Sequence, residues 1–295
     1  MSITSVVWGT TWVASKIGIS EMPALQMASI RQFLAGICFV LYFIIWKRMP
    51  LPSARQFVWL IVMAILMFVF ANGSSTWSLK YIPTGLSSLI GALYPLSVVL
   101  IERIFFNTRN LNSLTITGLL LGIAGIAIVF FENAFHHRSE GFLFGAVLSV
   151  VAMLSWSAGT IFMGRNKVNI NPYYATGWQM LLSAVILFGV AHTTQPTIAV
   201  SAIPLKVWIV LAYLVLAGSL LSFAAFIYSM KHLPVAISSL YAYFNPIVAM
   251  ITAAIIMNEK LTMNILWGTL VTLTGVFLVN LSVKRNEKIV AEPEQ

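Results

Sequence analysis

Long apolar segments, separated by short polar ones, follow one another along almost the whole chain. An α-helix rises about 1.5 Å per residue, so about 20 apolar residues can cross the hydrocarbon core of a bilayer. The runs are continuous rather than alternating, which argues against a β-barrel. We therefore expect an all-α membrane protein with ten transmembrane helices, at residues 2–19, 24–46, 57–78, 82–106, 113–131, 139–162, 172–191, 206–229, 234–257 and 262–281.

Two stretches of this pattern are copies of each other. Residues 80–95 read KYIPTGLSSLIGALYP, and residues 231–246, 151 positions further on, read KHLPVAISSLYAYFNP. Over a window of twenty positions that includes these stretches, seven residues are identical. Matching interrupted helices in two halves of a chain are typical of transporters built from two structural repeats.

Weaker matches in the same order extend the duplication to both ends of the chain. They are Trp8 with Trp156, Gln32 with Gln179, and Gly118 and Gly125 with Gly268 and Gly275. The duplication predicts one five-helix repeat at 1–133, a second at 139–283 and a charged cytoplasmic tail at 284–295.

The basic residues predict how the helices are oriented. Eleven Lys and Arg residues fall in one set of predicted loops and the tail, and four fall in the opposite set. Basic loops stay in the cytoplasm, so we expect a multi-pass protein of the inner (cytoplasmic) membrane with both termini cytoplasmic. Five helices per repeat is an odd number, so the second repeat must enter from the other side. The repeats are then inverted, with Lys80 external and Lys231 cytoplasmic.

Composition excludes a soluble domain. The chain is 59% hydrophobic and 8% charged, with a mean hydropathy of +0.92. The net charge of +9 comes from residues in short loops, where topology signals belong, so we expect a lipid bilayer and a small-molecule substrate as partners, and no nucleic acid. The single cysteine, Cys38, cannot form a disulfide within the chain. Small-residue faces such as Gly118 and Gly125 suit helix packing within a monomer or in a homodimer.

Each copy carries a proline and polar side chains within a predicted span. Pro95 and Pro246 each remove a backbone hydrogen bond and are candidate hinges, although packing kinks would explain them as well. A polar stripe should face the bundle interior and could line a substrate cavity or join helices. The stripes contain Ser87 and Tyr94 in the first copy and Ser238, Tyr241 and Asn245 in the second.

Four cations have open roles. Lys80 and Lys231 lie at the predicted mouths of a pathway, as gate residues or as charges at helix C-termini. Lys16 and Arg31 fall inside spans, where they could extend to an interface or bind a substrate carboxylate.

Segments along the whole chain resemble the EamA-type branch of the drug/metabolite transporter superfamily. They are WGTTWVASKIG at 8–18, the early Arg31 in the second helix, LKYIPTGLSSLI at 79–90 and NEKLTMNILWGTLVTLTGVFLVN at 258–280. The resemblance implies ten helices in two inverted repeats around a central cavity, and export or exchange of small metabolites, amino acids among them. It adds Trp8, Thr11, Trp77 and Trp156 as candidates to line that cavity, although tryptophan also belongs to interfacial belts.

One position departs from the family pattern. A Gly-Glu-x-Leu motif often stands between the last two helices of each half. The second half keeps the acid, as Asn258-Glu259-Lys260-Leu261, whereas the first half has Arg109 in its place.

These features favour a secondary transporter, an exporter or exchanger, that moves a small metabolite such as an amino acid by alternating access. The alternatives are a non-saturable channel and a broad multidrug or xenobiotic exporter. We expect no enzyme activity, cofactor or metal site, because the sequence contains no GxxxxGK[ST], HExxH or GxSxG motif and no cluster of His and Cys.

The acids predict how transport is driven. The chain contains no Asp, and none of its eight Glu lies in the middle of a predicted span. Ion-coupled carriers often rely on an intramembrane carboxylate, so we expect weak or absent coupling to protons. Uptake into proteoliposomes should be nearly the same with and without an imposed pH gradient, and uptake driven strongly by that gradient would contradict this expectation.

Overall fold

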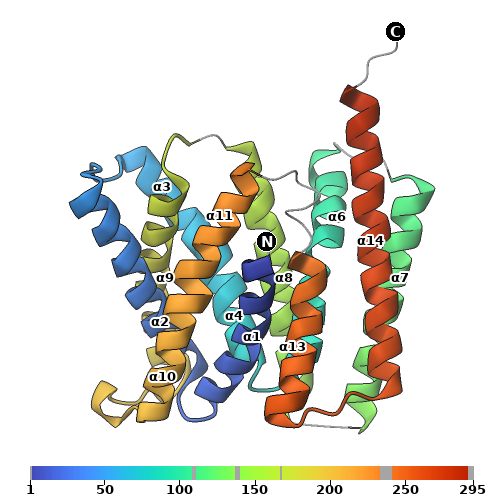
Figure 1. Cartoon of the computed structure of the whole chain (residues 1–295), viewed down its shortest axis with the longest axis horizontal. Coiled ribbons are helices and arrows are strands. Elements are labelled where there is room, and N and C mark those ends of the chain that lie inside the picture. The colour runs from blue at the N-terminus through green and yellow to red at the C-terminus, as the bar shows by residue number, and fades with distance from the viewer. Residues whose placement is uncertain (1, 108–110, 137–139, 167, 233–240, 292–295) are drawn as a thin grey trace.

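The computed structural model describes residues 2–107, 111–136, 140–166, 168–232 and 241–291. Within these ranges every regular element is a helix and no strand occurs, so the predicted all-α fold class is confirmed (Figure 1). The first half contains α1 (Ser2–Ile19), α2 (Ala24–Leu41), η1 (Tyr42–Trp46), α3 (Ala54–Met63), η2 (Ala64–Gly73), α4 (Ser74–Ser78), α5 (Thr84–Ala92), α6 (Tyr94–Phe106) and α7 (Ser113–His136). The second contains α8 (Phe142–Arg165), α9 (Pro172–Thr194), η3 (Val200–Ala202), α10 (Leu205–Tyr213), η4 (Leu214–Leu221), α11 (Ser222–His232), α13 (Tyr241–Met257) and α14 (Met263–Ala291).

Several of these elements join end to end into longer rods. In the described part of the chain, eight rods of 20 to 28 residues are long and apolar enough to cross a membrane. The shorter α13 is also apolar, and α1 is helical where a helix was predicted but is not among the eight. The first turns predicted for the ninth span lie outside the described residues, so the count of ten spans stays a prediction.

Several helix ends differ from the prediction, and two of the differences are explained or bear on a predicted segment. The rod Ala54–Ser78 begins at Ala54 rather than residue 57, because Ser53 and Gln56 form a capping box in which each side chain accepts a hydrogen bond from the other residue's backbone N–H. The last helix continues to Ala291, so the first part of the predicted charged tail is helical.

The helices pair across the two halves of the chain. α7 packs along α14 on one flank of the bundle, and α2 packs along α9 on the other (Figure 1). Between these flanks, α1 packs against α13 and α8 packs against α5 and α6. Each of these pairings therefore has an equivalent when the two halves are exchanged.

Small residues let α7 and α14 approach closely. A Cβ atom built on Gly125 would lie 2.4 Å from the backbone nitrogen of Thr272 and 2.5 Å from the carbonyl oxygen of Gly268. A Cβ on Gly118 would lie 2.7 Å from the carbonyl oxygen of Gly275. The glycines that match in sequence thus oppose each other along an antiparallel pair. This small-residue face is occupied inside the monomer.

Two π-helices occur at matching positions. η2 and η4 begin at Ala64 and Leu214, 150 residues apart, within the rods Ala54–Ser78 and Leu205–His232. A π-helix holds an extra residue per turn and often marks a functional site. η2 lines the central cavity described below, and η4 bonds to two residues that line it, Trp8 and Arg31.

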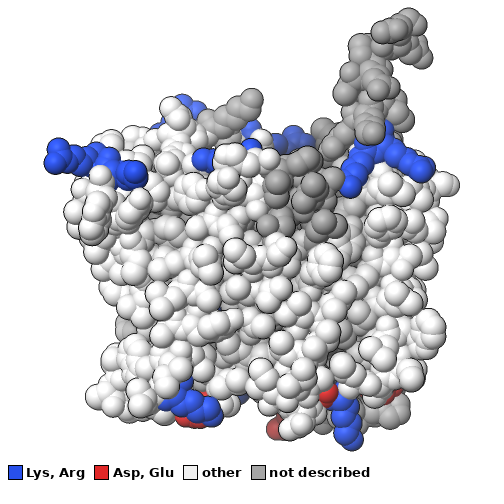
Figure 2. All heavy atoms as spheres, viewed as in Figure 1, with Lys and Arg blue, Asp and Glu red and all other residues white. Residues whose placement is uncertain are grey.

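Charged residues mark the two ends of the bundle. On the face shown in Figure 2, Lys and Arg lie along the upper and lower margins, acids lie along the lower margin, and the band between carries neither. The lower end is where α13 turns into α14, and the upper end is where α14 finishes (Figure 1).

We predict that the α7–α14 contact cannot accept a methyl group. Gly125→Ala should lower the free energy of unfolding by about 1–3 kcal/mol, because its Cβ would overlap the backbone of α14. Gly189→Ala is the matched control: nothing lies within 4 Å of its Cβ position, and the helix propensity of alanine should leave stability unchanged or raise it by up to about 1 kcal/mol. Thermal unfolding in detergent measures both variants, and equal unfolding temperatures would contradict the close contact.

Candidate substrate cavity

A cavity of about 170 Å³ lies in the middle of the bundle. Its walls come from α1, α2, η2, α4, α5, α6, α8, α11 and α13, which are elements of both halves. One water needs roughly 10–15 Å³ on a comparable measure, so the space exceeds that of a single buried water. The cavity is therefore a candidate site for a small solute.

Most of the predicted site residues line this cavity. They are Trp8, Thr11, Ser87, Tyr94, Trp156, Tyr241, Asn245 and Pro246. The structure thus brings together residues up to 238 positions apart in sequence, although their contact with a substrate stays a prediction.

The other predicted residues lie elsewhere. The Trp77 ring packs edge-on against Phe144, with ring centroids 5.3 Å apart, and is not part of the cavity wall. Lys80 and Lys231 are exposed, with their ammonium groups 5.9 Å and 5.3 Å from the ring centroids of Tyr81 and Tyr173. Ser238 lies outside the described residues.

The two candidate hinge prolines have different local structures. Pro95 is buried behind the cavity wall at the start of α6, and the helix is interrupted just before it, at Leu93, between α5 and α6. Pro246 lines the cavity within α13, which runs without a break from Tyr241. The matched prolines therefore do not produce matched interruptions in the described residues, and hinge motion stays a prediction.

Aromatic rings form one wall. The Trp8 ring contacts Trp156, Tyr241 and Phe223 at centroid distances of 6.2, 5.5 and 5.2 Å. Tyr94 stacks on Tyr241 with centroids 5.8 Å apart and planes 16° apart. We call Trp8, Tyr94, Trp156, Phe223 and Tyr241 the aromatic wall. Such a surface suits an apolar or aromatic part of a solute.

Hydrogen bonds hold this wall in place. Trp8 Nε1 donates to the carbonyl oxygen of Gly218 in η4 at 3.1 Å, and Trp12 Nε1 donates to Asn245 Oδ1 at 2.9 Å. The amide nitrogen of Asn245 donates to no described residue, which leaves two N–H donors beside the cavity.

Ser87 joins helices rather than standing free in the cavity. Its hydroxyl lies 2.9 Å from Ser78 Oγ and 2.8 Å from Ser149 Oγ, which links α4, α5 and α8. Thr11 donates within its own helix, to the carbonyl oxygen of Trp8 at 2.7 Å. For Ser87 the observed bonds favour the packing interpretation that the sequence left open.

Several lining residues were missed by the sequence reasoning, and Asn72 is the one with an amide side chain. Asn72, in η2, lines the cavity and accepts a hydrogen bond from Gln32 Nε2 at 2.9 Å. The available signal was an amide side chain inside an otherwise apolar predicted span.

Arg31 is a buried charge in the cavity wall. Its side chain is 6% exposed, and its Nε donates to Ser219 Oγ in η4 at 3.0 Å. The interpretation that Arg31 extends to a membrane interface is therefore wrong.

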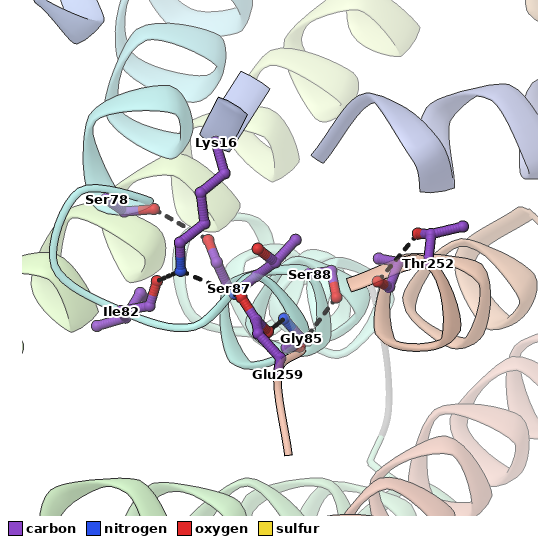
Figure 3. A network of polar contacts seen from close by, with 10 residues as sticks. Lys16, Ser78, Ile82, Gly85, Ser87, Ser88, Thr252 and Glu259 are labelled. Atoms are coloured by element: carbon purple, nitrogen blue, oxygen red, sulfur yellow. Dashed lines mark hydrogen bonds and ion pairs between the residues drawn. The ribbon is translucent and has the colours of Figure 1, made fainter. Parts of the chain in front are cut away.

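Lys16 is paired with an acid, a contact that the sequence reasoning did not include, and its two expected roles stay predictions. Its ammonium group lies 3.1 Å from Glu259 Oε1 and donates to the carbonyl oxygen of Ile82 at 3.1 Å (Figure 3). Glu259 also accepts from the backbone N–H groups of Thr84 at 2.9 Å and Gly85 at 3.3 Å. We call these contacts the Glu259 network.

The Glu259 network joins segments far apart in sequence. Glu259 comes from the turn between α13 and α14, caps the N-terminus of α5 and binds the end of α1. A carboxylate at a helix N-terminus bonds free N–H groups and complements the helix dipole. The counterpart in the first half, Arg109, lies outside the described residues.

The environment of Glu259 keeps it ionised. Burial alone would raise its pKa, but the charge of Lys16 and the hydrogen bond from Thr84 outweigh burial and lower the pKa below the ordinary 4.5. The carboxylate is therefore charged at neutral pH.

No cluster of three or more His, Cys, Asp or Glu that could hold a metal ion occurs among the residues that the structure describes.

We predict that Glu259→Gln lowers the free energy of unfolding by about 1–3 kcal/mol at neutral pH, because Lys16 and two backbone N–H groups lose a charged acceptor. A carboxyl whose folded pKa is lowered stabilises the fold fully above its ordinary pKa of 4.5 and loses that effect as pH falls through the lowered value. The difference from wild type should therefore persist on mild acidification and shrink only below about pH 4.5.

The exposed pair of Lys206 and Glu21, 2.6 Å apart, supplies the control. Glu21→Gln should change stability by about 0–1 kcal/mol, since solvent screens that pair. Thermal unfolding across the pH range would contradict the Glu259 network if the two variants behaved alike.

Comparison with known proteins gives the family and the fold of the chain. The sequence matches the EamA-like transporter family over residues 1–131 and 143–281. It is 25% identical to the "Uncharacterized transporter YoaV" of Bacillus subtilis, over 97% of each chain, and 29% identical to the "Uncharacterized inner membrane transporter YedA" of Escherichia coli, over 94% of this chain and 88% of that one. A solved crystal structure, 15% identical, shares the fold with a TM-score of 0.67 over 97% of this chain and 96% of its own. The chain is a multi-pass integral membrane protein and belongs to the EamA-like transporter family.

Proposed function

We propose that the protein is a secondary carrier that moves a small metabolite, such as an amino acid, across the cytoplasmic membrane by alternating access, as an exporter or exchanger. The observation that carries the proposal is the central cavity, whose walls come from both halves of the chain. A solute bound there touches both halves, so their relative movement can expose it to either side.

The arrangement of the two halves supports this mechanism. The family match falls in two segments that approximate the proposed inverted repeats at 1–133 and 139–283. The helix pairings and the matched π-helices η2 and η4 also have equivalents when the halves are exchanged. The charge bias of the loops supports two cytoplasmic termini, and the E. coli relative is named as an inner membrane protein.

The Glu259 network is a candidate closure at one end of the pathway. It ties α1 and α5, which line the cavity, to the turn that follows α13. Under the proposed orientation this end is external. The ionised pair would have to separate, or move as a unit, when the external end opens.

We predict saturable transport with counterflow. Purified protein in proteoliposomes, tested with a mixture of radiolabelled amino acids, should show saturation and faster uptake when unlabelled solute is present inside. Linear uptake without counterflow would favour a channel. Equal transport of unrelated hydrophobic dyes would favour a multidrug exporter.

A matched pair of variants connects this transport to the cavity. Tyr241→Ala removes a ring of the aromatic wall and should reduce uptake by about tenfold or more, on the scale of a lost aromatic contact and the space left behind. Phe244→Ala, three residues along the same helix, removes a ring that is 52% exposed and should leave uptake nearly unchanged. Loss of uptake in both variants, or in neither, would contradict the proposed pathway.

A further inference from the structure

The cavity holds one formal charge among its described lining residues, the guanidinium of Arg31. The side chain enters from α2 and is 94% buried, since only 6% of it is exposed. No acidic residue lines the same space in the described part of the chain. The cavity is therefore polarised by an uncompensated cation.

The hydrogen bonds of Arg31 are incomplete. A guanidinium carries five N–H donors. The Nε–H donates to Ser219 Oγ at 3.0 Å, and the four N–H groups on Nη1 and Nη2 bond to no residue that the structure describes. No carboxylate of the described residues pairs with Arg31 either.

The position of the guanidinium depends on its neighbours in η4 and α1. A Cβ atom on Gly218 would lie 3.3 Å from Arg31 Nη2 and 2.6 Å from Thr11 Cγ2, so the missing side chain at Gly218 leaves room for both. Ser219 fixes Nε from the next position. One edge of the planar group is held by the protein, and its other donors have no fixed partner.

Lys16, by contrast, is a charged residue whose partners lie within the protein. Its ammonium group is paired with Glu259 and bonded to the carbonyl oxygen of Ile82. An unpaired charge in a membrane interior is unfavourable and marks a functional site. Because Lys16 is paired within the protein and Arg31 is not, we expect Arg31 to pair with a ligand.

We propose that Arg31 is the anion-binding residue of the cavity, and that the cargo is a small amphipathic molecule with a carboxylate that pairs with Nη1 and Nη2 while its apolar part lies on the aromatic wall. The planar fork of arginine matches the two oxygens of a carboxylate, and such charge-assisted pairs are strong and specific. That the bound molecule is transported rests on the proposed carrier function. The binding claim stands on the cavity alone.

The test compares carboxylates with their amides, which have the same shape and no carboxylate, on purified protein. The probes are phenylacetate against phenylacetamide and L-phenylalanine against L-phenylalaninamide, with thermal unfolding as the readout, since a bound ligand stabilises the folded state by mass action. The carboxylates should raise the unfolding temperature of wild type and the amides should not.

Two substitutions separate binding from structure. Arg31→Met should weaken carboxylate binding by about 10- to 100-fold, as expected for a lost charged hydrogen-bonded pair. Arg31→Lys keeps the charge without the fork and should be intermediate. Without ligand, Arg31→Met should unfold at the wild-type temperature or above, because it removes a desolvated, unpaired charge. A structural role would instead lower that temperature.

The outcomes are distinct. Equal stabilisation by acid and amide, no stabilisation by any carboxylate, or carboxylate binding retained in Arg31→Met would overturn the proposal. So would equal stabilisation by chloride alone, measured without any carboxylate in the buffer. The carrier function is tested separately, by transport. Saturable counterflow, together with carboxylate binding that does not depend on Arg31, would support the carrier and contradict the role of Arg31. Linear flux of every solute, together with carboxylate binding that depends on Arg31, would contradict the carrier and support the role of Arg31.

Discussion

Every polar group inside a bilayer must find its partner within the protein, and this constraint organises the whole molecule. Backbone groups are bonded within helices, and hydroxyls such as those of Ser183 and Thr272 donate to carbonyl oxygens one turn earlier. Larger polar groups meet between helices, as in the bond from Gln32 to Asn72 and the serine chain through Ser87. Against this background, Arg31 is a buried charge whose Nη1 and Nη2 groups bond to no described residue, and it lines the central cavity.

The same constraint explains why the bundle has flanks and a centre. The outer pair of α7 and α14 is joined through opposed glycines and contributes nothing to the cavity wall, and α9 on the other flank does not reach it either. The inner helices α1, α5, α6, α8, α11 and α13 carry the polar stripes and the aromatic wall. The Glu259 network connects α1 and α5 to the turn between α13 and α14. Close packing at the flanks and adjustable polar contacts at the centre suit a protein whose halves move relative to each other.

Much of this arrangement follows from the sequence, and the remainder has physical reasons for escaping it. Hydropathy predicted the helices, and helical spacing within the duplicated segments predicted that Tyr94, Tyr241 and Asn245 face inward. The pairing of Lys16 with Glu259 joins residues 243 positions apart, so no local pattern could indicate it. Trp77 was misplaced because tryptophan suits both a cavity and a helix contact, and the packing of Phe144 decides between them. The π-helices depend on how neighbouring helices fit together, which hydropathy does not encode.

The central claim is that one cavity is reached in turn from both sides of the membrane. Single cysteines at Ala92 and Ala242, which line the cavity from α5 and α13, can be placed in a Cys38→Ser background and exposed to a membrane-impermeant thiol reagent from each side of oriented vesicles. A cysteine at the exposed Phe244 serves as the lipid-facing control. The account predicts that both cavity cysteines are labelled from either side, and that a transported solute changes the rates in opposite directions on the two sides. Labelling from one side only, under every condition, would contradict it.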